Sequence, residues 1–373
     1  MRRSFRPDAA GTSASPAGRL VWLAAFVAAP VLLQAVLLGT AWRDGNLGID
    51  LQQTLLPAAD EVASGRSPYP AYGYPPLVAF GLVPLTVLPA PHVIFTLLLL
   101  GGVPASLWLL GVRDWRCYGA AFLWAPVFSA VQTGNVTIPL LLGVSACWHW
   151  RDRARAAATA GGLAIAAKIL CWPLVVWLCA TRRIRTGAGA VAVAVGVTLG
   201  LWAILGFSGL LDYPSSLRGL GEQVTPDGYT LKALLTDLGA GSTVAGLAGA
   251  LLAGATLVGV VLYGRRGDER RSLALAAVAM IVASPIVWLH SFALLLVPVA
   301  LLRPRLSLVW ALPVTLVLAS GTGNGTVWQT ALVLGVAALV VGIVMWPVRT
   351  AARAEAQGPD PVGSASTTAL PVA

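Results

Sequence analysis

Charged residues are scarce in this chain, and they are absent from its apolar runs, apart from one lysine. Only 11% of the 373 residues are charged, whereas 57% are hydrophobic. Such a composition excludes a soluble globular domain of this length. None of the fifteen acidic residues lies inside an apolar run. Proton-coupled transporters generally need a carboxylate or a charge pair at mid-membrane, so this absence disfavours that class.

Lysine, cysteine and histidine are also rare. Lys168 and Lys232 are the two lysines, so the net charge of +10 comes from arginine. The four cysteines lie in or beside apolar runs without paired spacing, which favours buried structural residues over disulfides or metal ligands. The three histidines are scattered, and no helix carries two acids at ligand spacing. We therefore expect neither a metal site nor a cofactor. The net positive charge, in a chain of this apolar composition, does not indicate nucleic-acid binding.

Long apolar runs recur along nearly the whole chain. A run of about 20 apolar residues is long enough to cross a bilayer as a helix. The sequence therefore predicts an all-α, polytopic transmembrane bundle over residues 19–347, between disordered cytoplasmic tails at 1–18 and 348–373. About twelve membrane helices are expected, over residues 19–42, 75–91, 93–112, 116–130, 134–150, 157–181, 187–210, 241–264, 272–288, 290–303, 306–320 and 327–347.

Arginine clusters predict the orientation of this bundle. Cytoplasmic loops carry an excess of basic residues. With twelve crossings, nearly all arginine clusters fall on one side, and the acid-rich segments 43–74 and 211–240 face outside. Arg151, Arg153 and Arg155 are the exception, because this count places them outside. The two short runs before them are open to an alternative, a partial hairpin that turns at Gln132-Thr133-Gly134-Asn135.

The segment 43–76 combines carboxylates with aromatic residues beside the first apolar run. Such a cluster at a membrane surface suits chemistry on a substrate with a lipid tail and a polar head. Asp50 is either a catalytic carboxylate or the cap of a helix that starts near Leu51, and Asp44 is its rival. The tyrosines of the segment either stack on a sugar or anchor the loop at the interface; they are Tyr69, Tyr72 and Tyr74.

Two basic side chains are isolated in apolar surroundings. Lys168 interrupts an apolar run, where an unpaired ammonium costs at least ~2.5 kcal/mol on insertion scales. It either meets an anion such as a phosphate or extends to the membrane interface. His290 follows Ser284-Pro285 at an expected helix break. It either donates to a phosphate or sugar hydroxyl or is a satisfied structural residue.

An ordered set of short motifs connects these residues along the chain. They are Asp50, Gly65-x-x-x-Tyr69, Tyr74-Pro75-Pro76-Leu77, Gln132-x-Gly134-Asn135, Ala166-Ala167-Lys168, Glu222-Gln223 and Ser284-Pro285-x-x-Trp288-x-His290. The ordered set resembles glycosyltransferase family 87, whose members are integral-membrane enzymes of the C-type (GT-C) architecture. Val131, Val287 and Ser291 depart from the family's pattern.

The resemblance implies a function and a set of site residues. It implies a bacterial, multi-pass plasma-membrane hexosyltransferase that acts at the outer face. The donor would be a polyprenyl-phosphate-sugar, with mannose as the sugar, and the acceptor a cell-envelope glycolipid or glycan. Asp50 would be the catalytic base. The substrate-binding residues would be Lys168, His290, Tyr74, Gln132 and Gln223.

Two other classes of function remain open from the residues themselves. One is a transporter or flippase for lipids or polyisoprenoids, which the missing mid-membrane carboxylates disfavour. The other is a non-catalytic membrane protein of envelope assembly, which the departures at Val287 and Ser291 keep open.

Overall fold

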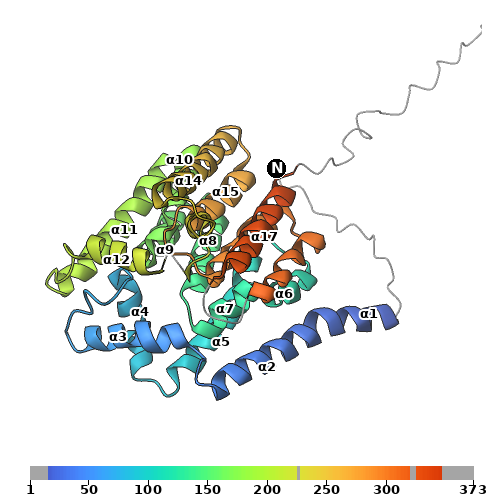
Figure 1. Ribbon diagram of the computed structural model, residues 1–373, viewed down its shortest axis with the longest axis horizontal. Helices are drawn as coiled ribbons and strands as arrows, with labels where there is room; N and C mark the ends of the chain where they lie inside the picture. Colours follow the sequence, from blue (N-terminus) through green and yellow to red (C-terminus); the bar gives the residue numbers. More distant parts are fainter. Residues whose placement is uncertain (1–15, 225–226, 320–324, 347–373) are drawn as a thin grey trace, which may run out of the picture.

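The computed structural model describes residues 16–224, 227–319 and 325–346, and every regular element in that part of the chain is helical. The prediction of an all-α fold is confirmed. An N-terminal arm, formed by α1 (Pro16–Leu23), the π-helical turn η1 (Ala24–Ala28) and α2 (Ala29–Arg43), runs along one edge of the bundle (Figure 1). The predicted tails lie outside the described residues, except that α1 already begins at Pro16.

Fewer helices are long and apolar enough to cross a membrane than the sequence predicted. There are five among the described residues: Leu20–Arg43, α5 (Pro91–Leu109), α11 (Ile184–Ile204), α14 (Ser242–Arg265) and α17 (Val327–Met345). The prediction of about twelve is not confirmed, because several of the apolar runs are broken. The run 116–130, for example, divides into two helices just before Pro126, whose ring prevents a continuous helix.

The remaining elements are shorter and complete the bundle. They are η2 (Leu51–Leu55), α3 (Leu56–Ala63), α4 (Pro76–Thr86), α6 (Trp115–Phe122), α7 (Ala125–Thr133), α8 (Thr137–His149), α9 (Ala154–Ala167), η3 (Ile169–Cys171), α10 (Pro173–Ala180), α12 (Tyr213–Val224), α13 (Leu231–Asp237), α15 (Glu269–Val282), η5 (Leu289–Leu295), α16 (Leu296–Leu302), η6 (Leu308–Trp310) and η7 (Leu312–Ala319).

The segment from α9 to α10 leaves one end of the bundle and returns to it. Asp152, just before α9, forms an ion pair of 2.8 Å with Arg183, just after α10. Because its two ends meet, the segment is a hairpin. Its turn lies at Lys168, where the backbone becomes extended (φ −154°, ψ 121°). The prediction of one continuous helix over 157–181 is therefore wrong.

Two further segments are also bent at a break between helices. α7 and α8 are bent by 116° at the break between Thr133 and Thr137, where the sequence predicts the turn of a partial hairpin. α15 packs against α16, with an irregular turn between them at 283–288. The three hairpins therefore turn at residues 134–136, 168 and 283–288.

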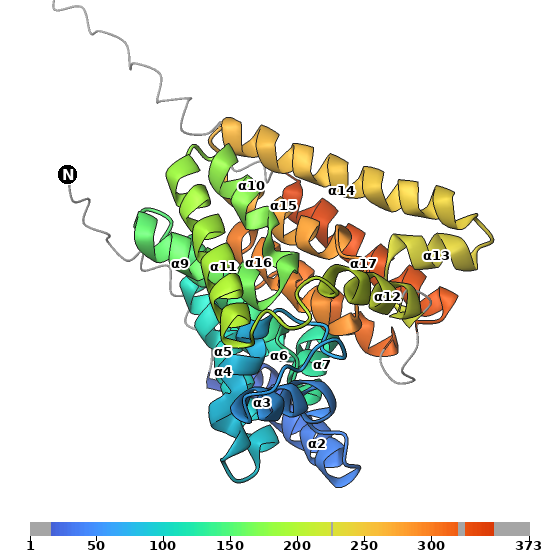
Figure 2. The ribbon, with the colours of Figure 1, turned by 90° about the vertical axis from the view of Figure 1, so that its left-hand side faces the viewer.

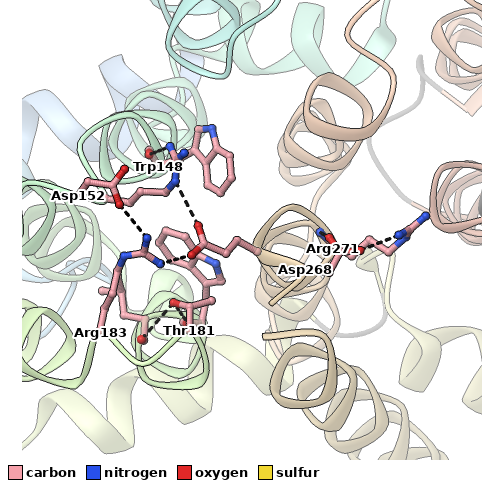
Figure 3. Close-up of polar contacts among 10 residues, drawn as sticks. Trp148, Asp152, Thr181, Arg183, Asp268 and Arg271 are labelled. Carbon is pink, nitrogen blue, oxygen red and sulfur yellow. Dashed lines mark hydrogen bonds and ion pairs between the residues drawn. The ribbon is translucent and has the colours of Figure 1, made fainter. Parts of the chain in front are cut away.

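A network of arginines and acids joins helix ends at one end of the bundle (Figure 3). Glu269 accepts hydrogen bonds from Arg183 at 2.7 Å and from Arg151 at 3.2 Å. Arg183 also binds Asp152, and this hydrogen bond lowers the pKa of Asp152 below its ordinary value, so the pair stays ionised at neutral pH. Arg151 thus lies at the same end of the bundle as Arg183. The exception in the predicted distribution of arginines is thereby removed.

The acid-rich segments contain short helices. Segment 43–74 contains η2 and α3, and segment 211–240 contains α12 and α13, of which α13 lies beside α14 and α17 (Figure 2). Leu51 and Leu55 are fully buried and pack into the protein core. Tyr69 and Tyr72 are buried as well, so they hold the segment to the bundle.

The arginine network gives a prediction about stability. Glu269→Gln removes the charge that two guanidinium groups share, so we expect it to destabilise the fold by about 1–2 kcal/mol. The midpoint of thermal unfolding in detergent should fall by a few degrees. Glu222→Gln is the matched control, because Glu222 is exposed and forms no ion pair among the described residues. Equal midpoints for the two variants would show that the network contributes nothing.

Candidate functional site

A cavity of about 870 Å³ lies where the three hairpin turns meet the segment around Asp50. This volume is within the range of roughly 300–1,000 Å³ that small-molecule sites occupy. Its polar lining includes Asp50, Tyr74, Gln132, Lys168 and His290. Five of the six residues that the sequence assigned to a site therefore line one cavity, although they come from four different parts of the chain.

The segment at Asp50 is docked directly onto the turn between α7 and α8. The N–H of Gly48 donates to the carbonyl oxygen of Gln132 at 2.6 Å. Gly48 and Gly134 both adopt positive φ, of 71° and 70°. A Cβ on Gly134 would lie 2.9 Å from the Cβ of Leu51, so glycine permits the close approach of the two backbones. This docking places Asp50 beside Asn135.

The Asp50 carboxylate points away from its own helix. It makes no capping hydrogen bond at the start of η2. Instead, its Oδ2 accepts a hydrogen bond of 2.8 Å from the Nδ2 of Asn135. The capping alternative is thus not realised. The rival carboxylate, Asp44, is exposed and does not line the cavity.

Lys168 lies at the turn between α9 and η3 and lines the cavity. Pro173 contributes to this break, because it lacks the N–H that a continuous helix would donate to the carbonyl of Ile169. The Nζ of Lys168 lies 5.3 Å from the centroid of the Tyr74 ring, a cation–π distance. No ion pair involves Lys168 among the described residues. Its charge therefore remains free for an anion in the cavity.

His290 is the second residue of η5 and is 5% exposed. Its Nε2 is buried and has no hydrogen-bond partner among the described residues. The turn before it is held by a hydrogen bond of 2.8 Å from the N–H of Tyr229 to the carbonyl of Val287. A buried imidazole nitrogen without a partner costs free energy, and a ligand in the cavity would recover that cost.

Gln223 is the site prediction that the cavity does not include. It is exposed on α12, whereas Leu220 and Val224 of the same helix line the cavity. Conversely, the sequence did not single out Asn135 as a site residue. Its place in the Gln132-x-Gly134-Asn135 motif was the available signal.

The cavity thus combines a carboxylate, an ammonium group and an imidazole without an ion pair between them. A carboxylate can accept a proton from a hydroxyl group. An ammonium group can neutralise an anionic leaving group, and the imidazole can donate a hydrogen bond to it. This combination is suited to group transfer from a phosphate to a hydroxyl.

The comparison with protein families gives the class. The model of glycosyltransferase family 87 matches residues 72–285, more than half of the chain. The chain belongs to glycosyltransferase family 87, and its apolar helices make it a membrane glycosyltransferase. No curated protein and no solved structure is detectably similar to it. The match includes Tyr74, Gln132 and Lys168, but Asp50 and His290 lie outside it, so the roles of these two depend on the geometry of the cavity.

The docking at Gly134 gives a second prediction. Gly134→Ala places a Cβ against Leu51 at positive φ, and the left-handed conformation alone costs about 1–2 kcal/mol for a non-glycine residue. We expect a lower unfolding midpoint in detergent and reduced sugar transfer, since Asp50 shifts relative to the hairpin turns. Gly101→Ala is the control, because it lies in α5 with open space around its Cβ position. A Gly134→Ala variant as stable and active as the Gly101 variant would contradict the docking.

Proposed function

We propose that this protein transfers a hexose from a polyprenyl-phosphate-sugar donor to a cell-envelope glycolipid or glycan at the outer face of a bacterial plasma membrane. The observation that carries the proposal is the meeting of Asp50, Lys168 and His290 in one cavity. Mannose is the proposed sugar, by analogy with the family members that the sequence motifs resemble.

Asp50 is the proposed catalytic base. It takes the proton of the acceptor hydroxyl as the hydroxyl oxygen attacks the anomeric carbon of the donor sugar. The bond between that carbon and the phosphate oxygen breaks, and the lipid phosphate leaves with the electron pair. Because the phosphate is already a stable anion, no strong general acid is needed. A single displacement inverts the anomeric carbon, so a β-linked donor gives an α-linked product.

Lys168 and His290 are the proposed partners of the donor phosphate. Lys168 lies at the turn of one hairpin and His290 follows the turn of another, and neither has an acidic partner among the described residues. Both could therefore approach the two sides of a phosphate, where they would stabilise the charge that develops as it leaves. Tyr74 and Gln132 line the same cavity and are the proposed contacts to the sugar. Gln223 has no part in this proposal, because it lies outside the lining.

The distribution of charge supports the outer face as the site of the reaction. The Arg151–Glu269–Arg183 network lies at the end of the bundle from which the hairpins start, and their turns form the cavity away from it. Basic residues accumulate on the cytoplasmic side of membrane proteins. With the arginine network in the cytoplasm, the cavity opens in the outer half of the protein.

Asp50→Asn tests the proposed base. The amide keeps the size of the side chain but cannot take the proton, so transfer should slow by roughly 10²–10⁴-fold. The measurement is transfer of radiolabelled sugar from polyprenyl-phosphate-mannose to total lipid, in membranes with equal amounts of protein. Asp44→Asn is the control and should keep most of the activity, because Asp44 is exposed outside the cavity. Wild-type rates in the Asp50 variant would remove it from the mechanism.

Lys168→Met tests the phosphate contact. Losing a hydrogen bond between charged groups costs about 1.5–3 kcal/mol, so the KM for the lipid-phosphate-sugar should rise roughly 10- to 100-fold. Lys232→Met is the matched control, since Lys232 is the other lysine and lies on α13 outside the lining. An unchanged KM at normal membrane levels would show that Lys168 does not bind the donor.

A further inference from the structure

Asn135 connects the Asp50 carboxylate to the start of α8. It is 2% exposed, and its Nδ2 donates to Asp50 at 2.8 Å. Its Oδ1 accepts two hydrogen bonds from Thr137, one from the backbone N–H at 3.0 Å and one from the Oγ1 hydroxyl at 2.8 Å. Three hydrogen bonds therefore use both ends of one buried amide.

The orientation of this amide follows from chemistry. A backbone N–H can only donate, so Thr137 requires the oxygen of Asn135 on its side. The NH₂ group must then face Asp50, and a carboxylate is the acceptor that it finds there. The side chain of Asn135 has no other orientation that satisfies both neighbours. Thr137 thus determines which atom Asp50 meets.

We propose that Asn135, oriented by Thr137, is a positioning residue that holds the Asp50 carboxylate for proton transfer. This inference rests on the proposed function only in calling Asp50 the base. Oδ2 of Asp50 is engaged by Asn135, whereas Oδ1 has no hydrogen-bond partner among the described residues. Oδ1 is therefore the oxygen left to accept the proton of the acceptor hydroxyl.

Asn135 has a simpler structural role as well, because Oδ1 caps the first turn of α8. A cap needs only the oxygen, and aspartate caps a helix about as well as asparagine does. Asn135→Asp therefore keeps the cap and replaces the donor that faces Asp50 with an acceptor. Thr137→Val removes the hydroxyl donor while keeping the shape, and Thr137→Ser restores it. These variants separate positioning from capping.

The first measurement is steady-state sugar transfer as a function of pH. In Asn135→Asp two carboxylates share one site. The acidic limb of the profile of kcat against pH should therefore shift to higher pH by about one unit or more. We expect kcat at neutral pH to fall at least about tenfold while the KM for the donor stays within about twofold. Thr137→Val should change kcat in the same direction by a smaller factor, and Thr137→Ser should recover it. If Asn135 only capped α8, the acidic limb of the kcat profile would lie at the same pH in Asn135→Asp as in the wild type.

The second measurement does not depend on activity. A hydrophobic carbodiimide reacts with protonated carboxyl groups, and mass spectrometry of the peptide containing Asp50 reports labelling against pH. Labelling should extend to higher pH in Asn135→Asp and, more weakly, in Thr137→Val than in the wild type and Thr137→Ser. If Asn135→Asp fails to fold, the comparison of Thr137→Val with Thr137→Ser tests the positioning role. Coincident labelling curves for the folded variants and the wild type would overturn the positioning role. If the labelling curves of the variants shift although the wild-type protein transfers no sugar, the proposed function is rejected and the coupling between Asn135 and Asp50 is kept.

Discussion

The arrangement of this protein depends on one constraint: in a membrane, backbone polar groups must find partners within the protein. Irregular backbone at membrane depth is tolerated where it is buried in protein or lines a polar cavity. The three hairpins obey this constraint, since their irregular turns lie together around one cavity. The breaks at Lys168 and at Ser284–Trp288 are costly in lipid, but here they present polar side chains and backbone to a shared interior.

The same clustering explains why the cavity holds opposite charges that do not pair. Asp50 is engaged by the neutral amide of Asn135, and Lys168 lies against the face of Tyr74. Each charge thus has a weak partner instead of its opposite. Such an arrangement keeps the carboxylate available for a proton and the ammonium available for an anion. A direct ion pair between them would have neutralised both groups.

The opposite end of the bundle serves a different purpose. There the charges do pair, and Glu269 receives both Arg151 and Arg183 (Figure 3). These contacts connect α8, α9, α10, α11 and α15 at the points where the hairpins begin. A rigid base for the hairpins limits the movement of their turns, and catalysis needs such rigidity to hold reacting groups at a constant separation.

The sequence by itself determined the class of the protein, because its apolar runs and arginine clusters reflect the bilayer, and its ordered motifs identified the family. It also marked Lys168 and His290, because isolated polar residues in apolar surroundings need a reason, and it marked Asp50 as part of a carboxylate-rich segment that resembles the family's motif. Only the tertiary structure decided that they share a cavity and that Gln223 does not. Asp50 meets Asn135 across 85 positions of the chain. The hydrophobic periodicity of the sequence does not indicate such a contact. The contact depends on where helices break and on how closely Gly48 and Gly134 allow two backbones to approach.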